Sequence, residues 1–385
     1  MKYFIPTYSQ CRDICDANDN FTFYENKHIV EGYNVSIFCY RLAMPPLFYK
    51  PTNNPEITAQ ELRGLTYVWN TDGSLFSHYL LMDKFFNLNQ SECSSYNVLK
   101  NKKIKEIAYK EDGSIVSFIK LPNDKIIAKT KASFEADQAI QSQKIFEENI
   151  AIQNLVTYCL NNNIVPIFEF VSPTNRVVLK YDKTDLVLIK LRNNLTGQYI
   201  STKNIPEELI KDITIVKTFD NYTLNDLIKK SETDKGYEGF VITFEDDKMI
   251  KLKLLDYIAL HNLHTEEIHR EDSLIYLVIN EQIDDVICQL DETDERRQLI
   301  YEIIDVVNHY INRQYSATKD LLSLYNGDIK TFYITNSKSP QIYYAMRVIN
   351  HGHDLLHVIN DKILRDTYFL MNARKWVNNE KKLMK

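Results

Sequence analysis

Two lysines and one glutamate stand in strand-like segments where a charged side chain needs a physical reason. Lys251 and Lys253 share one face of segment 249–255, because side chains two residues apart on a strand point the same way. Two ammonium groups side by side repel each other, so the pair indicates either an anion site or an exposed polar face. Glu169 stands in the apolar stretch 167–171, where burying an unpaired carboxylate is unfavourable. We therefore expect Glu169 to pair with a cation or to line a polar site.

A third feature is the run Lys110–Gly113, with the sequence KEDG. On its own the Asp-Gly pair indicates a hairpin turn in which glycine accepts a positive φ, and Asp72–Gly73 shows the same turn chemistry without a lysine. Glu238, which precedes a glycine and a strand-like segment, repeats the acidic pattern of Glu169.

Together these residues fit covalent nucleotidyl transfer. A lysine must be neutral to attack phosphorus, whereas a free lysine has a pKa of about 10.4. Neighbouring ammonium groups and a metal ion lower that pKa, and they also stabilise negative charge on a transferring phosphoryl group. In this interpretation Lys110 attacks, while Lys251, Lys253 and Mg²⁺ surround it. Glu169 and Glu238 then orient the nucleotide sugar and the metal or the lysine, and one hard condensation is split into two easier transfers.

In order and spacing these residues resemble the motifs of the covalent nucleotidyltransferase superfamily of polynucleotide ligases and mRNA capping enzymes. The more specific resemblance is to the tRNA-repair RNA ligases of T-even bacteriophages. It extends from about residue 36 to about residue 261. The strings that carry it are SIFCY (36–40, the weakest), ELRG (61–64), DKFFNLN (83–89), KEDGSIVS (110–117), FEFVSPTNRVVL (168–179) and EGFV (238–241) followed by KLK (251–253).

The resemblance implies an ATP-dependent RNA ligase with Lys110 as the adenylylated lysine. It implies that Arg63 and Lys84 reach the triphosphate and help pyrophosphate leave. It also makes Tyr40 and Phe86 further contacts of the ATP pocket.

Downstream of the nucleophile, the resemblance implies that Lys131 contacts phosphate. The local string AKTKAS departs from the family, which more often has a glycine before the serine, and so Lys129 stays an alternative. The remaining implied roles are Glu169 for the ribose, Glu238 for the nucleophile or a metal-bound water, and Lys251 and Lys253 for the α-phosphate.

The implied reaction has three steps. Lys110 attacks the α-phosphorus of ATP, AMP passes to an RNA 5′-phosphate, and a 3′-hydroxyl then displaces AMP to seal the strand. The implied cofactors are ATP and Mg²⁺, with Mn²⁺ as a substitute. The implied partners are RNA ends, nicked tRNA among them, and a polynucleotide kinase–phosphatase that prepares the ends.

The pattern of elements predicts an α+β protein. Strand-like segments and turn signals fill residues 1–257, whereas helical periodicity with few Gly or Pro residues fills 258–385. With the resemblance, this predicts a nucleotidyltransferase (ligase) fold of antiparallel sheets with flanking helices over 1–257, in which 1–100 shape the ATP pocket. An all-helical C-terminal domain follows over 258–385, and the family suggests a role for it in RNA specificity.

Local patterns predict single elements within the first domain. Residues 104–130 are expected to form a β-meander with turns at EDG and PND. The other predicted elements are strands at 34–42, 62–70, 164–172, 176–181 and 186–193, a hairpin turn at Asp72–Gly73, helices at 135–163 and 218–232 with Thr223 as a cap, and a hairpin over 236–255.

Asp284 and Asp285 are the candidate metal ligands. Their spacing after the KLK strand is similar to that of an acidic pair that helps the family to hold a metal through water. The alternative is an acidic pair on the surface of a helix.

Composition limits the class of protein. Six scattered cysteines form no CxxC pair, which argues against a zinc knuckle or a disulfide framework. The net charge of −6 argues against a protein that coats nucleic acid, but not against an enzyme with a locally basic groove. No apolar run reaches the roughly 18 residues that cross a bilayer, and the N-terminus turns polar too soon for a signal peptide. We expect a cytoplasmic protein, of the host cell if the chain is viral, with no membrane partner.

Three alternatives remain open at this point. A DNA ligase and a GTP-using capping enzyme share the chemistry, but both normally carry an OB-fold domain, for which no strand pattern follows the KLK strand. An inactive RNA-binding module would keep the fold without the reaction. A P-loop kinase is unsupported, because no GxxxxGK[ST] motif is present.

Overall fold

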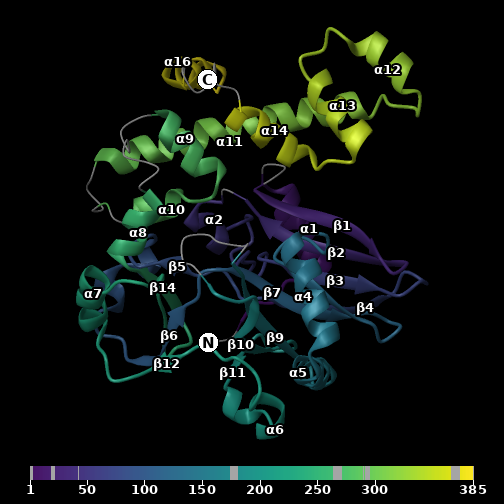
Figure 1. Cartoon of the computed structure of the whole chain (residues 1–385). Helices are drawn as coiled ribbons and strands as arrows, with labels where there is room; N and C mark the ends of the chain where they lie inside the picture. Colours follow the sequence, from purple (N-terminus) through teal and green to yellow (C-terminus); the bar gives the residue numbers. More distant parts are fainter. Residues whose placement is uncertain are drawn as a thin grey trace. The chain divides into compact units, whose positions relative to one another are not determined.

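The computed structural model describes residues 3–18, 22–41, 43–173, 181–262, 271–288, 290, 295–365 and 373–384 (Figure 1). The chain divides into two units, Met1–Ala17 with Phe23–His264 and Asn18–Thr22 with Thr265–Lys385. Each unit is described by itself. In the described part of the chain, no helix is long and apolar enough to cross a membrane.

A four-stranded antiparallel sheet opens the first unit, with the order β1-β2-β3-β4. Its strands are β1 (Phe23–Val30), β2 (Tyr33–Tyr40), β3 (Leu65–Trp69) and β4 (Leu75–Tyr79). The predicted strands at 34–42 and 62–70 and the hairpin turn at Asp72–Gly73 are thereby confirmed, apart from residue 42, which lies outside the described residues. Two short helices, α1 (Tyr8–Asp16) and α2 (Pro45–Tyr49), contribute Ile14 and Phe48 to the core of this region.

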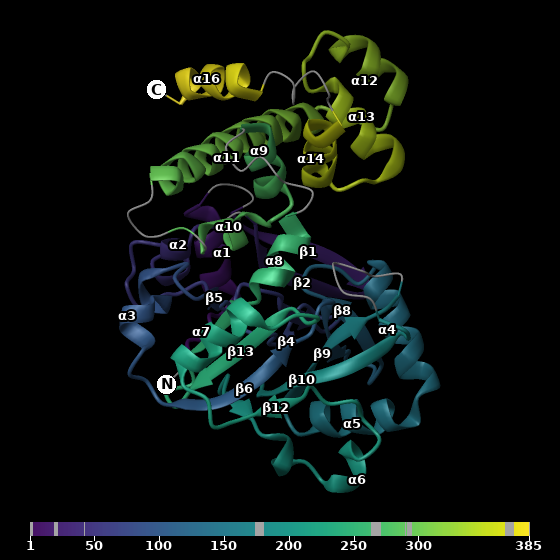
Figure 2. The ribbon, with the colours of Figure 1, turned by 60° about the vertical axis from the view of Figure 1, so that its left-hand side comes forward.

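Two five-stranded sheets form the rest of the first unit (Figure 2). The first has the order β12-β6-β13-β14-β5, with β12 (Thr218–Phe219), β6 (Ile104–Lys110), β13 (Gly239–Phe244), β14 (Met249–Lys253) and β5 (Phe86–Asn87). The second has the order β11-β10-β9-β7-β8, with β11 (Tyr199–Ile200), β10 (Asp185–Asn193), β9 (Ile164–Val171), β7 (Ser114–Lys120) and β8 (Ile126–Thr130). Neighbours pair antiparallel except β5, which runs parallel to β14.

The predicted meander over 104–130 is only half right. β7 and β8 pair as a hairpin, but β6 pairs with β12 and β13 and not with β7. The KEDG run therefore leads the chain from one five-stranded sheet into the other instead of closing a hairpin. A turn signal reports where a strand ends, but pairing depends on distant strands. Here Lys110 pairs with Gly239, and Ser114 pairs with Phe170.

The helix predicted over 135–163 is two helices, α4 (Asp137–Glu148) and α5 (Ile150–Asn161). The break falls at Asn149, whose side chain caps α5 by accepting hydrogen bonds from the backbone N–H groups of Ala151 and Ile152. α5 packs on the second five-stranded sheet through Leu155, beside Phe168.

The helix predicted over 218–232 is shorter, α7 (Leu224–Thr233), and its predicted cap, Thr223, is confirmed by a capping box with Asp226. The hairpin predicted over 236–255 is confirmed as β13 and β14. Of the strand predicted at 176–181, residues 176–180 lie outside the described residues. The remaining helices of the unit are α3 (Tyr96–Leu99), α6 (Glu207–Ile210) and α8 (Leu255–Asn262).

The second unit is helical throughout its described residues, as the periodicity predicts. Its helices are α9 (Glu271–Ile279), α10 (Ile283–Ile287), α11 (Glu295–Leu322), α12 (Ile329–Asn336), α13 (Ile342–His351), α14 (Leu355–Arg365) and α16 (Ala373–Leu383). The long helix α11 packs against α9, α13, α14 and α16. The α+β class with antiparallel sheets and a helical C-terminal region is confirmed.

Candidate active site

Lys110 ends β6 and lines a cavity of about 420 Å³ whose walls come from strands of both five-stranded sheets. Small-ligand pockets have volumes of roughly 300–1,000 Å³, so the space suits a nucleotide-sized molecule. Five of the residues predicted for the site line this cavity: Arg63, Lys110, Lys131, Glu169 and Lys251. They come from segments far apart in the sequence, and the crossing of the chain between the two sheets brings them together.

Glu238 stands behind the nucleophile candidate. Lys110 Nζ donates a hydrogen bond to Glu238 Oε2 at 2.6 Å, and Lys253 Nζ lies 3.1 Å from Glu238 Oε1. Glu238 is only 2% exposed, so this carboxylate binds both ammonium groups away from bulk water. The arrangement holds the Lys110 amine against a proton acceptor at the rim of the cavity.

Strand register explains why a glycine follows Glu238. Gly239 is the direct partner of Lys110 on one side and of Lys253 on the other. A Cβ at this position would lie 2.2 Å from the carbonyl oxygen of Leu252, and the φ of +149° also favours glycine. The glycine thus lets β14 pass close to β13, which sets the separation of the two lysines.

Lys251 is the centre of a group of positive charges that we call the Lys251 cluster. The cluster consists of Arg63, Lys84, Lys110, Lys251 and Lys253. Burial, followed by repulsion from the other four cations, holds the pKa of Lys251 well below its ordinary value. Glu238 bonds to two members of the cluster, Lys110 and Lys253. Mutual repulsion of cations beside a cavity favours the binding of an anion there.

Glu169 lies on β9 in the wall of the same cavity. Burial raises its pKa to about 7, although Lys110 and Arg63 act in the opposite direction. Among the described residues Glu169 makes no ion pair, so the sequence alternative that it lines a polar site fits the structure. Its oxygens are available to the hydroxyl groups of a ligand.

Aromatic rings stand beside the cluster on the side of the N-terminal sheet. Lys84 Nζ lies over the rings of Tyr40, Phe48 and Phe86, at 4.9, 5.4 and 5.2 Å from their centroids. Tyr40 and Phe86 therefore contact Lys84 and do not line the cavity. Its lining includes Phe85 instead, which lies under Lys251 Nζ at 5.5 Å. The FF pair in the sequence could not show which ring faces the ligand.

Lys129 and Lys131 occupy different environments. Lys131 lines the cavity, and its Nζ lies 5.0 Å from the centre of the Tyr40 ring. Lys129 is 1% exposed and its Nζ donates to the carbonyl oxygen of Thr130 at 3.0 Å. Burial lowers the pKa of Lys129 to about 8. The geometry favours Lys131 as the phosphate contact.

Two tyrosines that the sequence reasoning missed hold the KEDG crossing in place. The hydroxyl of Tyr257 donates to Asp112 Oδ1 at 2.9 Å. The hydroxyl of Tyr181 accepts from the Asp112 backbone N–H at 2.9 Å and donates to Glu111 Oε2 at 3.0 Å. With 25 tyrosines in the chain, residue type gives no signal for these two. They fix the loop that directly follows the nucleophile candidate.

Asp284 and Asp285 lie in the first turn of α10, in the second unit. The described residues contain no group of three or more His, Cys, Asp or Glu side chains that could hold a metal by itself. The predicted role of the two aspartates in metal binding stays a prediction.

In sequence this chain is similar to RNA ligases. A family model described as RNA ligase matches residues 61–257, slightly more than half of the chain. A Thermovibrio ammonificans protein named as a candidate RNA ligase is 25% identical over 300 residues, covering 76% of this chain and 74% of that protein.

Among solved structures, an archaeal ATP-dependent RNA ligase is similar with a TM-score of 0.47 and 12% identity, over 86% of this chain and 87% of that one. A lysine-to-alanine variant of Naegleria gruberi RNA ligase, solved with ATP and Mn, has a TM-score of 0.35 and 16% identity, over 65% of this chain and 82% of that one.

Proposed function

The chain belongs to the RNA ligase family, and we propose that this ATP-dependent RNA ligase works through a lysyl-AMP intermediate formed on Lys110. The observation that carries the proposal is the contact of Lys110 Nζ with Glu238 at the edge of a cavity rich in cations. Membership of the family also removes support from the DNA ligase, capping enzyme and binding-module alternatives.

In the first step Lys110 Nζ gives a proton to Glu238 and attacks the α-phosphorus of ATP. A P–N bond forms, the bond from the α-phosphorus to the bridging oxygen breaks, and pyrophosphate leaves with the electron pair. The 2.6 Å contact supports Glu238 as the proton acceptor. The nearby Lys253 contacts the other oxygen of this carboxylate and orients it toward Lys110.

Lys251 and Lys253 hold the α-phosphate in this proposal. Both lie on β14, on the face that carries the Lys251 cluster. An incoming triphosphate would relieve the repulsion among these cations and favour the ammonium form of Lys251. Donors fixed in advance in a water-poor site stabilise developing charge without reorganisation.

Of the remaining predicted contacts, Glu169, Arg63 and Lys131 line the cavity, whereas Lys84 lies beside the cluster among aromatic rings. Glu169 accepts hydrogen bonds from the ribose hydroxyls, which its place in the cavity wall supports. Arg63 and Lys84 receive the β- and γ-phosphates, and Lys131 adds a further phosphate contact. Tyr40 and Phe86 act indirectly, because they pack around the Lys84 ammonium group.

A divalent metal, which we propose to be Mg²⁺ with Mn²⁺ as a substitute, fits the donors that are present. Magnesium in proteins usually takes one or two carboxylates and completes its shell with water and substrate phosphates, so a preformed cage is not required. Glu111 and Glu169 are the carboxylates that line the cavity and would hold it, and Asp284 and Asp285 stay candidates through water. When bound, the ion neutralises phosphate charge.

We further propose that the later steps join an RNA 5′-phosphate to a 3′-hydroxyl. AMP passes from Lys110 to the 5′-phosphate, and the 3′-hydroxyl then displaces AMP. Broken tRNA, with ends prepared by a polynucleotide kinase–phosphatase, is the substrate that the bacteriophage resemblance favours. The helical second unit is the proposed region for RNA specificity.

The test is transfer of radiolabel from α-labelled ATP to the protein with a divalent metal present. Wild type should retain label after denaturation and release it in acidic hydroxylamine, as a P–N bond does. Lys110→Ala should retain none. Lys105→Ala is the matched control, because Lys105 lies on the same strand, β6, and pairs with Asp247 at 2.6 Å on the exposed side. Equal labelling of wild type and Lys110→Ala would overturn the assignment of the nucleophile.

A further inference from the structure

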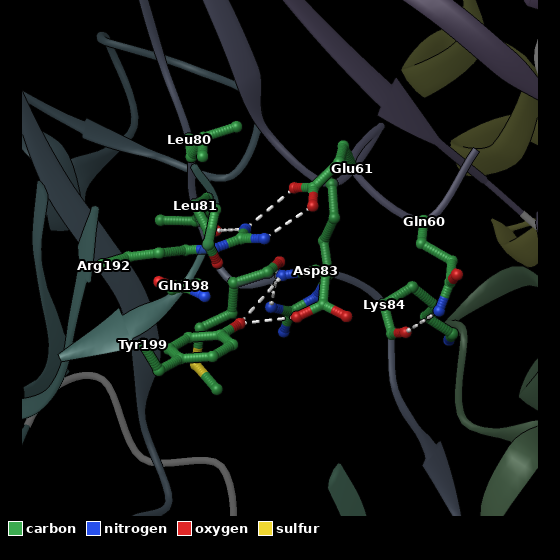
Figure 3. A network of polar contacts seen from close by, with 12 residues as sticks. Gln60, Glu61, Leu80, Leu81, Asp83, Lys84, Arg192, Gln198 and Tyr199 are labelled. Atoms are coloured by element: carbon green, nitrogen blue, oxygen red, sulfur yellow. Dashed lines mark hydrogen bonds and ion pairs between the residues drawn. The ribbon is translucent and has the colours of Figure 1, made fainter. Parts of the chain in front are cut away.

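A second charged group, built around Arg192 and Glu61, is buried in the first unit (Figure 3). The Arg192 guanidinium is fully buried, and its Nη1 and Nη2 donate to the two carboxylate oxygens of Glu61 at 2.8 and 2.5 Å. Its Nη1 also donates to the carbonyl oxygen of Leu81, and its Nε donates to that of Gly197 at 2.8 Å. This bidentate geometry satisfies both the cation and the carboxylate.

Tyrosine rings and one more carboxylate complete the group. The rings of Tyr3 and Tyr199 lie 5.1 and 5.0 Å from Arg192 Cζ. The Tyr199 hydroxyl donates to Asp83 Oδ1 at 2.5 Å and accepts from the Asp83 backbone N–H at 3.3 Å. We call the set of Glu61, Asp83, Arg192 and Tyr199 the Arg192 network.

Burial raises the pKa of Glu61, although Arg192 acts in the opposite direction. Burial opposes the charge of Arg192, but Glu61, Tyr199 and Asp83 together raise the pKa of the guanidinium above its ordinary value. A buried ion pair of this kind is weak evidence for stability, since apolar residues of the same shape would often serve as well. We therefore consider which chain segments this ion pair joins and not how much it stabilises the fold.

Two members of the network are near neighbours in sequence of two predicted triphosphate contacts. Glu61 lies two residues before Arg63, and Asp83 directly precedes Lys84. The same two segments bond to each other, because Lys84 N–H donates to the carbonyl oxygen of Gln60 at 2.8 Å.

Arg63 is also held from this side. Its Nη1 donates to the carbonyl oxygen of Met82 at 3.2 Å, so the guanidinium rests on the segment that Asp83 and Leu81 tie to the network. Asn194, two residues after Arg192, adds a further tie, since its Oδ1 accepts from the Leu80 backbone N–H at 3.0 Å. Arg192 on β10, Asn194 just after it and Tyr199 on β11 thus all bond to the segments on which Arg63 and Lys84 stand.

We propose that the Arg192 network is a positioning unit that sets Arg63 and Lys84 against the leaving pyrophosphate. The inference rests on the proposed function. Arg192, Glu61 and Tyr199 touch no substrate and act through the two cations. Each cation is placed by a backbone segment that the network holds to β10, so loosening the network moves both cations together.

The consequence is a difference between steps of the reaction. Adenylation of the lysine requires the triphosphate tail to be held and pyrophosphate to leave. Sealing of an RNA that already carries a 5′-adenylate involves no triphosphate. A residue that positions Arg63 and Lys84 should affect the first step and its reversal by pyrophosphate, but not the sealing step.

The test compares Tyr199→Phe and Glu61→Gln with wild type in three assays. They measure adenylation against ATP concentration, transfer of AMP from the adenylylated protein to pyrophosphate to re-form ATP, and ligation of chemically pre-adenylylated RNA. Because a misplacement of about 1 Å can reduce a rate roughly 100-fold, we expect about a 100-fold loss for Glu61→Gln and about a 10-fold loss for Tyr199→Phe in the first two assays. Ligation of pre-adenylylated RNA should stay within about 2-fold of wild type.

Glu25→Gln is the matched control. Glu25 is also a buried carboxylate paired with an arginine, Arg12, at 2.7 Å, but it stands on β1 and touches neither the Arg63 nor the Lys84 segment. It should change the three assays equally or not at all.

An equal loss in all three assays for Tyr199→Phe, or no loss in adenylation for both variants, would overturn the inference. Should Glu61→Gln fail to fold, Tyr199→Phe still decides, because it removes one hydroxyl and keeps the ion pair. Failure of the wild type to take up label would instead reject the proposed function.

Discussion

The Lys251 cluster and the Arg192 network lie in the same unit, but the partners of their charged side chains differ. In the Arg192 network Arg192 forms a bidentate ion pair with Glu61, its Nε donates to Gly197, and Asp83 accepts a hydrogen bond from the Tyr199 hydroxyl. In the Lys251 cluster, Lys110 and Lys253 share the carboxylate of Glu238, and Arg63, Lys110 and Lys251 line a cavity. The buried arginine is thus bonded by protein groups, whereas the cluster faces a space that we propose a ligand fills.

The difference shows how to separate structural charge from functional charge. A satisfied ion pair fixes two chain segments and gains nothing from an added anion. Cations held together without enough carboxylates raise one another's free energy, and a bound phosphate relieves that repulsion. In our proposal the Arg192 network positions Arg63 and Lys84, which are two members of the Lys251 cluster. Predictions that remove one charge from each group therefore have opposite signs for stability.

The largest expected effect comes from Lys251→Met, which keeps the length of the side chain and removes the charge. Adenylation should fall by roughly 10²–10³-fold, the usual loss for one donor to developing charge. Stability should rise, because burial and the neighbouring cations disfavour the charged form of Lys251 in the native state relative to the unfolded chain, and methionine removes that cost. Rates of label uptake and urea unfolding measure the two quantities.

Removing a charge from the Arg192 network should instead lower the stability of the protein. Glu61→Gln leaves a buried guanidinium with half of its partner, and removal of one member of such a pair typically lowers stability by about 3–5 kcal/mol. If Lys251→Met is destabilised as much as Glu61→Gln, the distinction between an unsatisfied cluster and a satisfied pair does not hold.

Sequence reasoning found the cluster but not the network, and the reason is physical. Strand alternation places Lys251 and Lys253 on one face from local information alone, and the KEDG run marks a loop. By contrast, Glu61 and Arg192 are 131 residues apart, and nothing near Arg192 in the strand-like LVLIKLRN segment indicates a buried partner. The same limit explains the meander error, since β6 and β7 are adjacent in sequence but find their partners in different sheets.

The next prediction concerns Glu169, a carboxylate in the wall of the cavity. Its pKa is raised from the ordinary 4.5 to about 7, chiefly by burial, so the native state binds a proton that the unfolded chain releases. Stability should therefore fall as the pH rises from about 4.5 through 7, by at most about 3 kcal/mol from this residue. Urea unfolding at several pH values measures the slope.

Glu169→Gln removes the titrating group and should flatten the slope over that window. Glu135→Gln is a control, since Glu135 is an exposed carboxylate in the same unit. A variant at Glu169 that keeps the full wild-type slope would mean that another group titrates there and that Glu169 is ionised in the cavity wall.

The smallest expected effect tests whether close backbone packing, rather than charge, shapes the point where the two sheets separate. A Cβ on Gly113 would lie 2.3 Å from the carbonyl oxygen of Phe170 and 3.1 Å from Glu169 Cγ. Gly113→Ala must therefore move the KEDG crossing or β9, at a cost of about 1–2 kcal/mol, the lower part of the range for overpacking. Differential scanning calorimetry and label uptake measure stability and adenylation.

Ile152→Val, in the core under α5, is the matched control, because it should lower stability by a similar amount, about 1 kcal/mol, without touching the cavity. The crossing carries Lys110 at one end and faces Glu169 at the other. Gly113→Ala should therefore reduce adenylation several-fold more than Ile152→Val at equal loss of stability. Equal activities at equal stability would mean that the crossing tolerates displacement, and that the nucleophile is positioned by Glu238 and the register of β6 with β13 alone.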